Sequence, residues 1–364
     1  MKIALVYDRV NKFGGAERVL LSLHKLFPDA PLYTSVYDSL KAPWAKQFST
    51  VYTTFLQSIP FAKGNHELLA PLMPLAFESF SFDDYDVVVS VTSEAAKGIR
   101  TKPHTVHICY CLTPTRYLWS GYEEYFPTPL FRIFTYPIVF YLKWWDKHAA
   151  TRADMMIAIS HEVRQRIETY YNIKPHVIYP PADLPGETTP QTEGKYPDSE
   201  NYLLIVSRLV PYKRIDLAIK ACNNLGLPLK IIGTGSQKKE LQKIAGPTIE
   251  FLGNLTDAEI VNFYTHCKGF LFPGKEDFGI TIIEAQQHGK PVLAYRGGGA
   301  LETIVEGKTG MFFDKQTITS LEQALQKFVK IRYNSDACRK NAEKFREERF
   351  LAEFQQVVEH ITKR

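Results

Sequence analysis

Cysteine is scarce in this chain, and no hydrophobic run is long enough to cross a membrane. The 364 residues include five cysteines, an odd number, and no Cys-x-x-Cys pair. Neither a disulfide framework nor a zinc site is indicated, so a reducing cytoplasm is the expected environment. The most membrane-like stretch, residues 133–142, would span about 15 Å as a helix, against about 30 Å of hydrocarbon in a bilayer.

The chain also lacks a strong charge of one sign. Forty-four basic residues minus 39 acidic residues give a net charge of +5. This mild surplus suits anionic ligands or lipids but is far below that of a nucleic-acid-binding protein, so nucleic acid is not an expected partner. The opening residues, MKIALVYD, lack the succession of regions typical of a signal peptide and predict a buried strand instead. We therefore expect a protein that is not exported.

Short β-branched runs alternate with helical patterns along nearly the whole sequence. This alternation predicts parallel sheets built from βαβ units, in two successive series. The first series contains runs at 2–7, 32–37, 87–91, 105–110, 155–159 and 177–179, and the second at 202–206, 229–232, 249–252, 269–272 and 291–294. The fold class expected is α/β, with two Rossmann-like, doubly wound domains facing each other across a cleft. Ligands of such sheets bind at the carboxyl ends of the strands.

A proline-rich segment separates the two series. Residues 180–200 hold five prolines and almost no large apolar side chains, a composition typical of a linker or surface loop. We predict an N-terminal domain over 1–182, a linker over 183–200 and a C-terminal domain over 201–345. Residues 346–364 are expected to form an amphipathic helix that packs back toward the N-terminal domain. Its predicted buried stripe is Phe350, Phe354, Val357 and Ile361.

The first predicted strand is followed by a loop, two glycines and a helical pattern. Gly14 and Gly15 have no Cβ atoms, so a ligand can approach the backbone there, and the helix beyond them can receive a phosphate or carboxylate. An ordinary tight turn explains the two glycines equally well.

The second series begins with a similar strand and loop, but this loop is basic. Residues 207–214 read Ser-Arg-Leu-Val-Pro-Tyr-Lys-Arg and follow the strand at 202–206. Arg208 offers a planar fork of donors and Lys213 a point charge, which together suit a diphosphate whose negative charge rises as it departs. The alternative is a solvated basic loop without a ligand.

The most informative stretch contains two glutamates around a predicted helix start. Gly279 opens a helix that Gly289 closes, so Glu276 lies in the loop before it and Glu284 about a turn and a half inside it. Carboxylates accept pairs of hydrogen bonds, which suits the hydroxyls of a sugar ring on one side and of a ribose on the other. A helix cap and a surface charge would explain the two carboxylates in isolation, but less well beside the basic loop.

These motifs resemble the signature of family 4 retaining glycosyltransferases. The resemblance is carried by Gly14-Gly15-Ala16-Glu17, by Ser207-Arg208-Leu209 with Lys213, and by Glu276-x7-Glu284, and it covers essentially the full chain. It implies a GT-B fold, an acceptor-binding N-terminal domain, a nucleotide-sugar donor held mainly by the C-terminal domain, and transfer with retention at the anomeric carbon.

The same resemblance assigns roles to individual residues. Arg208 and Lys213 would bind the donor diphosphate, Glu276 the hydroxyls of the transferred sugar, and Glu284 the nucleotide ribose. Arg208, Lys213 and Glu276 would be the catalytic residues. The remaining donor-binding positions would be Gly14, Gly15, Phe278, Gly279 and Ile280. We expect neither a cofactor nor a bound metal to be required.

Residues 276–280 and 294–303 resemble the mannosyltransferase branch that builds bacterial surface polysaccharides, which favours GDP-mannose as the donor. Leu112 stands where that branch has an active-site histidine. A leucine can neither donate a hydrogen bond nor relay a proton. Another residue supplies that contact, or the donor sugar lacks a 6-hydroxyl, or the activity is altered. His107 lies nearby, but such a histidine more often packs in place.

Residues 117–145 contain three tryptophans and many other aromatics, interleaved with Arg132 and Lys143. This composition suits the headgroup region of a membrane or a groove for a lipid-linked acceptor, and it suits packed amphipathic helices equally. The family's use of polyprenyl-diphosphate-linked acceptors favours peripheral contact with the inner face of the cell membrane, and a glycan or lipid-linked acceptor as partner. Two other functions stay open: a nucleotide-sugar epimerase, and a catalytically silent nucleotide-sugar-binding subunit, which only Leu112 supports.

Overall fold

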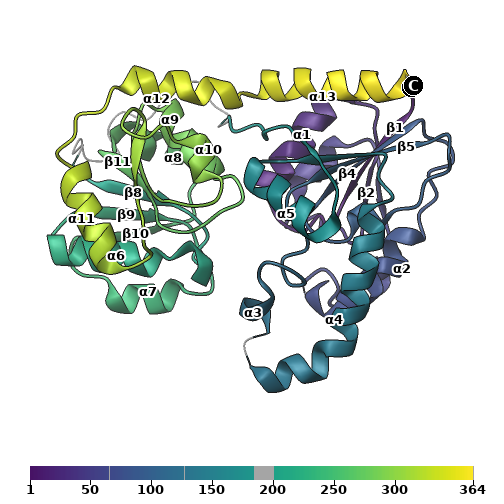
Figure 1. Ribbon diagram of the computed structural model, residues 1–364, viewed down its shortest axis with the longest axis horizontal. Coiled ribbons are helices and arrows are strands. Elements are labelled where there is room, and N and C mark those ends of the chain that lie inside the picture. Colours follow the sequence, from purple (N-terminus) through teal and green to yellow (C-terminus); the bar gives the residue numbers. More distant parts are fainter. Residues whose placement is uncertain (65, 127, 184–200, 364) are drawn as a thin grey trace. The chain divides into compact units, whose positions relative to one another are not determined.

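The computed structural model describes residues 1–64, 66–126, 128–183 and 201–363 (Figure 1). The chain divides into two compact units, Met1–Pro181 together with Phe350–Arg364, and Ala182–Arg349. Apart from Asp183, the predicted linker at 183–200 lies outside the described residues.

The first unit contains a seven-stranded sheet in which every neighbouring pair is parallel. Its order is β3-β2-β1-β4-β5-β6-β7. The strands are β1 (Ile3–Tyr7), β2 (Leu32–Thr34), β3 (Val51–Thr53), β4 (Val87–Thr92), β5 (Val106–Cys111), β6 (Met155–Ala158) and β7 (His176–Val177). The α-helices are α1 (Gly15–Leu26), α2 (Met73–Glu78), α3 (Tyr122–Tyr125), α4 (Pro129–Ala150), α5 (His161–Tyr171) and α13 (Glu347–Thr362).

The second unit repeats this plan with six parallel strands in the order β10-β9-β8-β11-β12-β13. The strands are β8 (Leu203–Val206), β9 (Leu229–Ile232), β10 (Ile249–Gly253), β11 (Gly269–Phe272), β12 (Val292–Tyr295) and β13 (Gly310–Phe313). The α-helices are α6 (Ile215–Leu225), α7 (Lys238–Ile244), α8 (Asp257–His266), α9 (Ile280–Gln287), α10 (Ala300–Thr303), α11 (Ile318–Phe328) and α12 (Ser335–Ala342). Two parallel Rossmann-like sheets confirm the predicted α/β fold class.

Two strands were not predicted, β3 and β13. Both lie at an edge of their sheet, and they are only three and four residues long. None of the three β3 residues is fully buried. The β3 strand gives a weak hydrophobic pattern because only one neighbouring strand covers it. The β13 strand is buried at three of its four positions, but four residues are too few to stand out as a run in the sequence.

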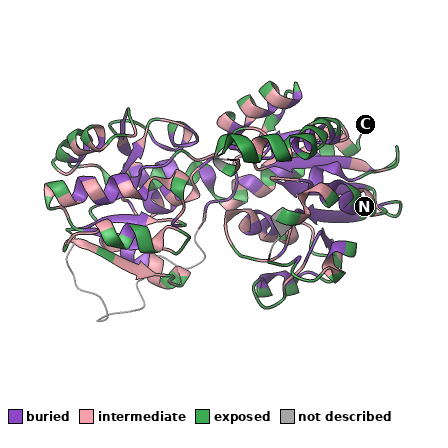
Figure 2. Ribbon diagram, turned by 90° about the horizontal axis from the view of Figure 1, so that it is seen from below, coloured by how far each residue is buried: buried purple, intermediate pink, exposed green. Residues whose placement is uncertain are grey.

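The central strands carry the core of each unit. In Figure 2 the strands are mostly buried, whereas many helices have one exposed side. The sequence of β4, Val-Val-Val-Ser-Val-Thr, is buried at every position. A parallel strand with both faces covered requires such a continuous run rather than an alternating one.

His107 lies in this core and not at a solvent-exposed site. It is buried on β5, and its Nε2 lies 2.8 Å from the hydroxyl of Ser90 on the neighbouring strand. Burial lowers the pKa of His107 to about 4. The expectation that this histidine packs in place is confirmed, so it does not replace the missing histidine at Leu112.

The pKa of His107 predicts a loss of stability in mild acid. The unfolded imidazole titrates near 6.5, so between about pH 6.5 and 4 the unfolded state binds a proton that the folded state does not. Above pH 6.5 the titration of this histidine has no effect on the free energy of unfolding. As the pH drops through this window, the free energy of unfolding falls by about 3 kcal/mol. All four tryptophans lie in the first unit, so urea unfolding followed by tryptophan emission reports on it. His107→Gln should flatten the pH dependence, and an equally steep dependence in the variant would contradict this prediction.

The C-terminal helix α13 packs its apolar stripe against the first sheet. The rings of Phe350 and Phe354 lie 5.7 and 6.2 Å from that of Tyr110 on β5. The third buried position is Val358, not Val357 as predicted, and Ile361 is only half-buried. Spacing of four residues throughout keeps the stripe on one line of the helix, whereas Val357 lies at its margin.

Candidate functional site

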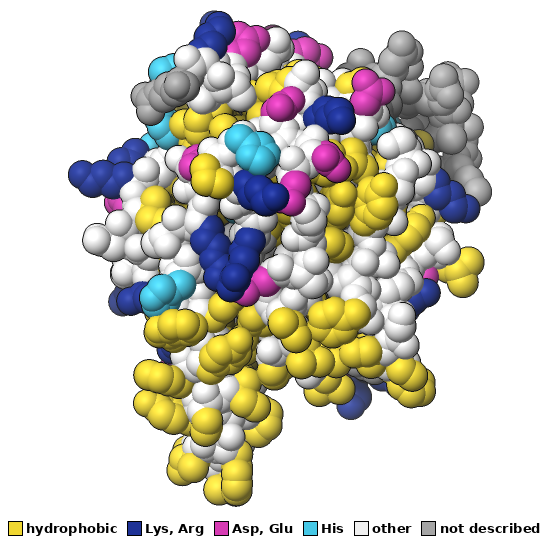
Figure 3. Space-filling view, turned by 90° about the vertical axis from the view of Figure 1, so that its right-hand side faces the viewer, with side chains coloured by type: hydrophobic (Ala, Val, Ile, Leu, Met, Phe, Trp, Pro, Cys, Tyr) yellow, Lys and Arg dark blue, Asp and Glu magenta, His cyan; other side chains and the backbone are white. Residues whose placement is uncertain are grey.

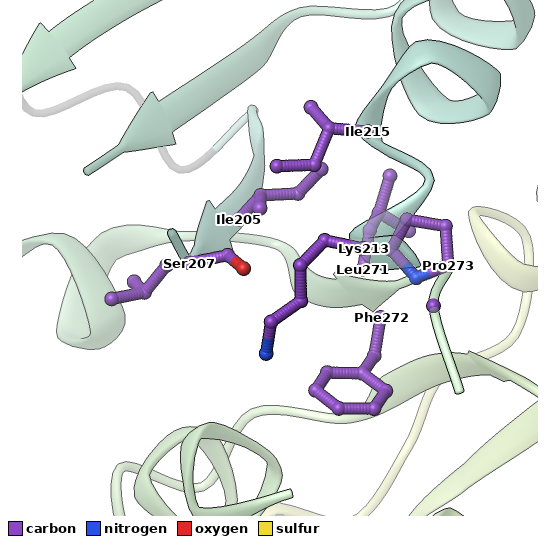
Figure 4. Close-up of a pocket in the computed structure, with 9 residues that line it drawn as sticks. Ile205, Ser207, Lys213, Ile215, Leu271, Phe272 and Pro273 are labelled. Atoms are coloured by element: carbon purple, nitrogen blue, oxygen red, sulfur yellow. The ribbon is translucent and has the colours of Figure 1, made fainter. Parts of the chain in front are cut away.

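A small pocket lies where β8 and β11 end. The two strands are neighbours, but the chain leaves β8 toward β9 and β10, while β12 and β13 lie beyond β11. Such a switch point opens a crevice at the carboxyl ends of a parallel sheet. The pocket is lined by Ile205, Val206, Ser207, Lys213, Ile215, Leu271, Phe272, Pro273 and Gly274. Lys213 extends into the space between Ser207 and Phe272 (Figure 4).

Lys213 and Glu276 form an ion pair beside this pocket. The ammonium contacts the carboxylate directly, and each side chain is 16% exposed. Lys213 ends the short 3-10 helix η5 (Pro211–Lys213), and Glu276 lies in the loop between β11 and α9. The two predicted catalytic residues, 63 positions apart in sequence, are therefore neighbours because their strands are neighbours.

Tyr212 connects the two predicted diphosphate-binding cations. Arg208 is exposed and donates from Nη2 to the Tyr212 hydroxyl at 2.6 Å, while the Lys213 ammonium lies 5.4 Å from the centre of the same ring. Gly274 lets the two loops approach, since a Cβ atom there would lie 2.8 Å from the Lys213 Cα. A larger residue at 274 would push the β11 loop away from the basic loop.

The glutamate motif has the predicted arrangement around α9. Gly279 precedes α9 with φ of +90°, a conformation that favours glycine. Glu284, inside α9, is only 4% exposed and accepts a 2.9 Å hydrogen bond from the Tyr264 hydroxyl. Phe278 is buried against Phe345, with ring centres 5.5 Å apart. Phe278 thus helps to anchor the loop, and Ile280 is half-buried at the start of the helix.

Two supports of this loop lie outside the basic and glutamate motifs. The Gly299 N–H donates to the Glu276 carbonyl oxygen at 2.9 Å, and a Cβ on Gly298 would lie 2.2 Å from that oxygen. The run of three glycines at 297–299 is the sequence feature that permits this contact. Tyr264, which holds Glu284, sits within α8 at a position that nothing in the sequence distinguishes from an ordinary core aromatic.

Gly14 and Gly15 belong to the first unit, where they begin α1 after β1. Gly14 is extended, with φ of −179°, a conformation open to any residue. Glu17 in the first turn of α1 is buried and accepts a 2.6 Å hydrogen bond from the Tyr7 hydroxyl. A carboxylate in the first turn is favoured by the helix dipole. Glu17 of this motif thus has a structural role that the sequence did not predict.

The carboxyl ends of β1 and β4 are joined through Asp8. Its carboxylate accepts hydrogen bonds from the Thr92 hydroxyl at 2.9 Å and from the backbone N–H groups of Ser93 and Ala96 at 2.6 and 2.8 Å. Burial raises the pKa of Asp8, and the nearby Glu94 raises it further. Asp8 therefore fixes the loop that follows β4.

Next to this loop lies a fully buried ion pair, Lys97 with Asp146, at 2.6 Å. Burial by itself would lower the pKa of Lys97, but the Asp146 carboxylate outweighs it and raises the pKa above its ordinary value. Asp146 also accepts from Thr115 at 2.7 Å, Trp119 at 2.8 Å and Tyr171 at 2.6 Å. This network holds the segment after β5, which begins with the half-buried Leu112.

Within the described parts of the chain, no three His, Cys, Asp or Glu residues are placed to hold a metal ion. The sequence has one Asp-x-Asp triplet, Asp84-Tyr85-Asp86, which precedes β4. It therefore lies at the amino ends of the strands, whereas Asp8 lies at their carboxyl ends. There Asp86 accepts a hydrogen bond from the Lys2 backbone N–H at 2.6 Å.

None of the helices in the described ranges has the length and apolar character needed to cross a membrane.

Comparison with protein families assigns both halves of the chain. Residues 13–184 match the model for Glycosyltransferase Family 4, and residues 188–345 match the model for glycosyl transferases group 1.

Curated relatives match over part of the sequence. An uncharacterised glycosyltransferase of Methanocaldococcus jannaschii is 26% identical over 51% of this chain and 53% of its own length. A GDP-mannose-dependent alpha-mannosyltransferase of Mycolicibacterium smegmatis is 29% identical over 47% of each protein. The chain thus spans about half the length of these relatives.

Solved structures match over the full length. HepE from Anabaena, determined with UDP and glucose, has a TM-score of 0.69 at 20% identity and 99% coverage of both chains. Sucrose-phosphate synthase from Thermosynechococcus elongatus has a TM-score of 0.77 at 16% identity, again with 99% coverage of both chains. At these identities the likeness establishes the fold alone. With one sheet domain matching Glycosyltransferase Family 4 and the other the group 1 glycosyl transferases, the chain belongs to the glycosyltransferases of the GT-B fold.

Proposed function

We propose that this protein is a retaining, metal-independent hexosyltransferase. It moves mannose from GDP-mannose to a glycan or polyprenyl-diphosphate-linked acceptor during polysaccharide biosynthesis at the inner face of the cell membrane. The observation that carries the proposal is the Lys213–Glu276 ion pair at the switch point of the second sheet, with Arg208 on the same loop.

The two cations, Lys213 and Arg208, supply positive charge to the departing nucleoside diphosphate. Breaking the bond between the anomeric carbon and the diphosphate leaves negative charge on the phosphate oxygens. Lys213 and Arg208 stabilise this charge more in the transition state than in the bound donor, and only such a difference accelerates the reaction. Donor binding replaces the contact of Lys213 with Glu276 by a contact with phosphate.

The two glutamates then act as hydroxyl acceptors. Glu276 is released from Lys213 and accepts hydrogen bonds from hydroxyls of the transferred sugar. Glu284, oriented by the Tyr264 hydroxyl, accepts from the ribose. A carboxylate can accept a pair of hydrogen bonds, which favours a diol over a single hydroxyl as its ligand.

The choice of mannose rests on relatives rather than on contacts. Two relatives are described as GDP-mannose-dependent mannosyltransferases, one from Mycolicibacterium smegmatis and one from Corynebacterium glutamicum, and each matches about half of the chain. The fold neighbour HepE, in contrast, was determined with UDP and glucose. Leu112 is the observation that favours the alternative, a nucleotide-sugar-binding subunit without activity.

The donor is tested by incubating the purified protein with GDP-mannose or UDP-glucose in the absence of acceptor, with and without EDTA. We expect slow release of GDP from GDP-mannose, insensitive to EDTA, and a larger thermal shift with GDP-mannose than with UDP-glucose. Nuclear magnetic resonance of the released or transferred sugar then reports the anomeric configuration.

Other results of this experiment would indicate a different donor or a different function. Preference for UDP-glucose would overturn the donor while leaving the enzyme class intact. An isomeric nucleotide sugar would indicate an epimerase, and saturable binding without any turnover, with acceptor glycans present, would indicate the silent subunit.

A further inference from the structure

The long helix α4 exposes an unusual amount of apolar surface. It extends away from the seven-stranded sheet of its unit (Figure 1), and hydrophobic side chains cover the projecting end at the bottom of Figure 3. Nine large apolar side chains of this helix are between 44% and 74% exposed. We call them the α4 surface: Leu130, Phe131, Ile133, Phe134, Tyr136, Ile138, Phe140, Tyr141 and Trp144.

The α4 surface is distinct from the side of the helix that packs on the protein. Exposed residues recur at 133, 136, 140 and 144, and again at 130, 134, 138 and 141, so they form two adjacent stripes. The buried residues lie on the other side: Val139 and Leu142 pack with Leu118, and Asp146 pairs with Lys97. Helix α4 is thus anchored along this buried side, and its other side presents apolar side chains to solvent, six of the nine in its first half.

A surface of this size is uncommon on a protein that has only water as a neighbour. Exposed aromatic and aliphatic side chains in one continuous patch indicate contact with a membrane or another protein. The composition of residues 117–145 alone left core packing and membrane contact equally open. The exposure of the α4 surface removes the core alternative for these nine side chains.

The charges around the patch discriminate among its possible partners. Residues 129–145 contain no aspartate or glutamate, while Arg132 and Lys143 lie along one margin of the apolar stripes, followed by Lys147. The Lys143 ammonium lies 4.9 Å from the ring centre of Tyr122 and 5.3 Å from that of Trp119. These contacts hold the cation at the margin instead of letting it extend freely into water.

An acidic side chain also lies near this margin. Glu123, on α3, approaches Arg132 to only 4.0 Å and is mostly exposed. An ion pair of that length and exposure contributes little, so the margin keeps its positive character. Above the apolar end, basic and acidic side chains lie side by side on the surface shown in Figure 3.

We propose that the α4 surface inserts into the headgroup and upper acyl region of a bilayer that contains anionic lipid. The helix lies in the interface: its aromatic and aliphatic side chains enter the apolar layer, and the cations at its margin contact lipid phosphates. This deepens the membrane contact in the proposed function, but it uses no residue of the pocket. Vesicle binding and sugar transfer can therefore fail separately.

The proposal is tested by sedimentation of the full chain with vesicles of phosphatidylcholine alone, or with about a third of phosphatidylglycerol. The test variant is Ile133→Ser with Phe134→Ser and Phe140→Ser. A matched control replaces three other exposed apolar residues, Leu40→Ser, Leu301→Ser and Ile331→Ser. We expect the test variant to lower the partition constant on anionic vesicles about tenfold or more, and the control to change it little.

Salt separates insertion from simple attraction of charges. In about 1 M salt, charges are screened within about 3 Å, so binding through charge alone disappears. We expect the wild-type protein to bind less tightly at that salt concentration but still better than the test variant, because the apolar contribution persists. Circular dichroism and the unfolding midpoint should be the same for the test variant and the wild type, since the three replaced side chains are exposed.

Trp144 gives a direct readout of depth. It is about half exposed on the α4 surface, whereas Trp44 and Trp145 are buried. Brominated lipid should quench the tryptophan emission of the wild-type protein on anionic vesicles. The conservative variant Trp144→Phe should lose most of that quenching while still sedimenting.

Three results would overturn the proposal. The first is equal vesicle binding by the wild type and the test variant, and the second is binding that vanishes completely in salt. The third is a wild-type dimer in light scattering that the test variant converts to a monomer while neither form binds vesicles, which would assign the α4 surface to a second copy of the chain.

Discussion

Replacing Lys213 by alanine is expected to lower kcat for sugar transfer, or for donor hydrolysis, about 10²- to 10³-fold. Removal of one fixed donor from a developing negative charge has an effect of this size. Lys213 lines the pocket and already lies against Glu276. The effect on KM should be smaller, because in the proposed binding mode Arg208 also holds the donor in the ground state. Arg208→Ala should lower kcat in the same direction.

Two controls make this prediction specific. Lys213→Arg retains a positive charge and should recover part of the rate. Lys239→Ala removes an exposed cation from α7 in the same unit and should leave kcat unchanged. The rate is measured as release of nucleoside diphosphate at saturating donor. A Lys213→Ala protein that keeps wild-type kcat would remove this side chain from the reaction, whatever its proximity to the pocket.

Replacing Lys97 by methionine is expected to destabilise the first unit by about 3–5 kcal/mol. Both members of the Lys97–Asp146 pair are buried, at 0% and 1% exposure, so the variant leaves a carboxylate without its counter-charge in the interior. Thr115, Trp119 and Tyr171 still donate to Asp146 but bring no positive charge. The measurement is urea unfolding followed by tryptophan emission.

A double variant and an exposed pair serve as controls. Lys97→Met with Asp146→Leu removes both charges and should lose much less stability than the sum of the two single changes. Lys102→Met breaks an exposed pair with Asp83, 2.5 Å long, and should change the free energy of unfolding far less than Lys97→Met does. If the double variant lost as much free energy of unfolding as the two single variants together, Lys97 and Asp146 would not be energetically coupled.

The sheets and the main motifs could be predicted because they depend on local sequence. A buried parallel strand requires a nearly continuous apolar run: β1, β8 and β11 each have one, and in β4 it is interrupted only by Ser90. The loops that follow β8 and β11 carry the basic and glutamate motifs. Once the strands are recognised as neighbours, the proximity of the two loops follows from sheet topology.

Contacts between distant side chains could not be predicted in the same way. Tyr264 bonds to Glu284 and Trp119 to Asp146, yet nothing in the sequence distinguishes these aromatics from ordinary core residues. Val358 replaced Val357 in the buried stripe of α13 because the exact angle of a helix on its sheet is set by packing. The aromatic composition of α4 was equally compatible with burial and with exposure.

The sequence by itself determined the α/β class, the doubling of the sheet and the placement of cations and carboxylates at strand ends, since each depends on short-range periodicity and spacing. Only the tertiary structure decided that Lys213 pairs with Glu276, that Lys97 and Asp146 are buried together, and that α4 turns nine apolar side chains toward solvent. Burial and pairing are properties of what packs against a residue, and that depends on elements far away in the chain.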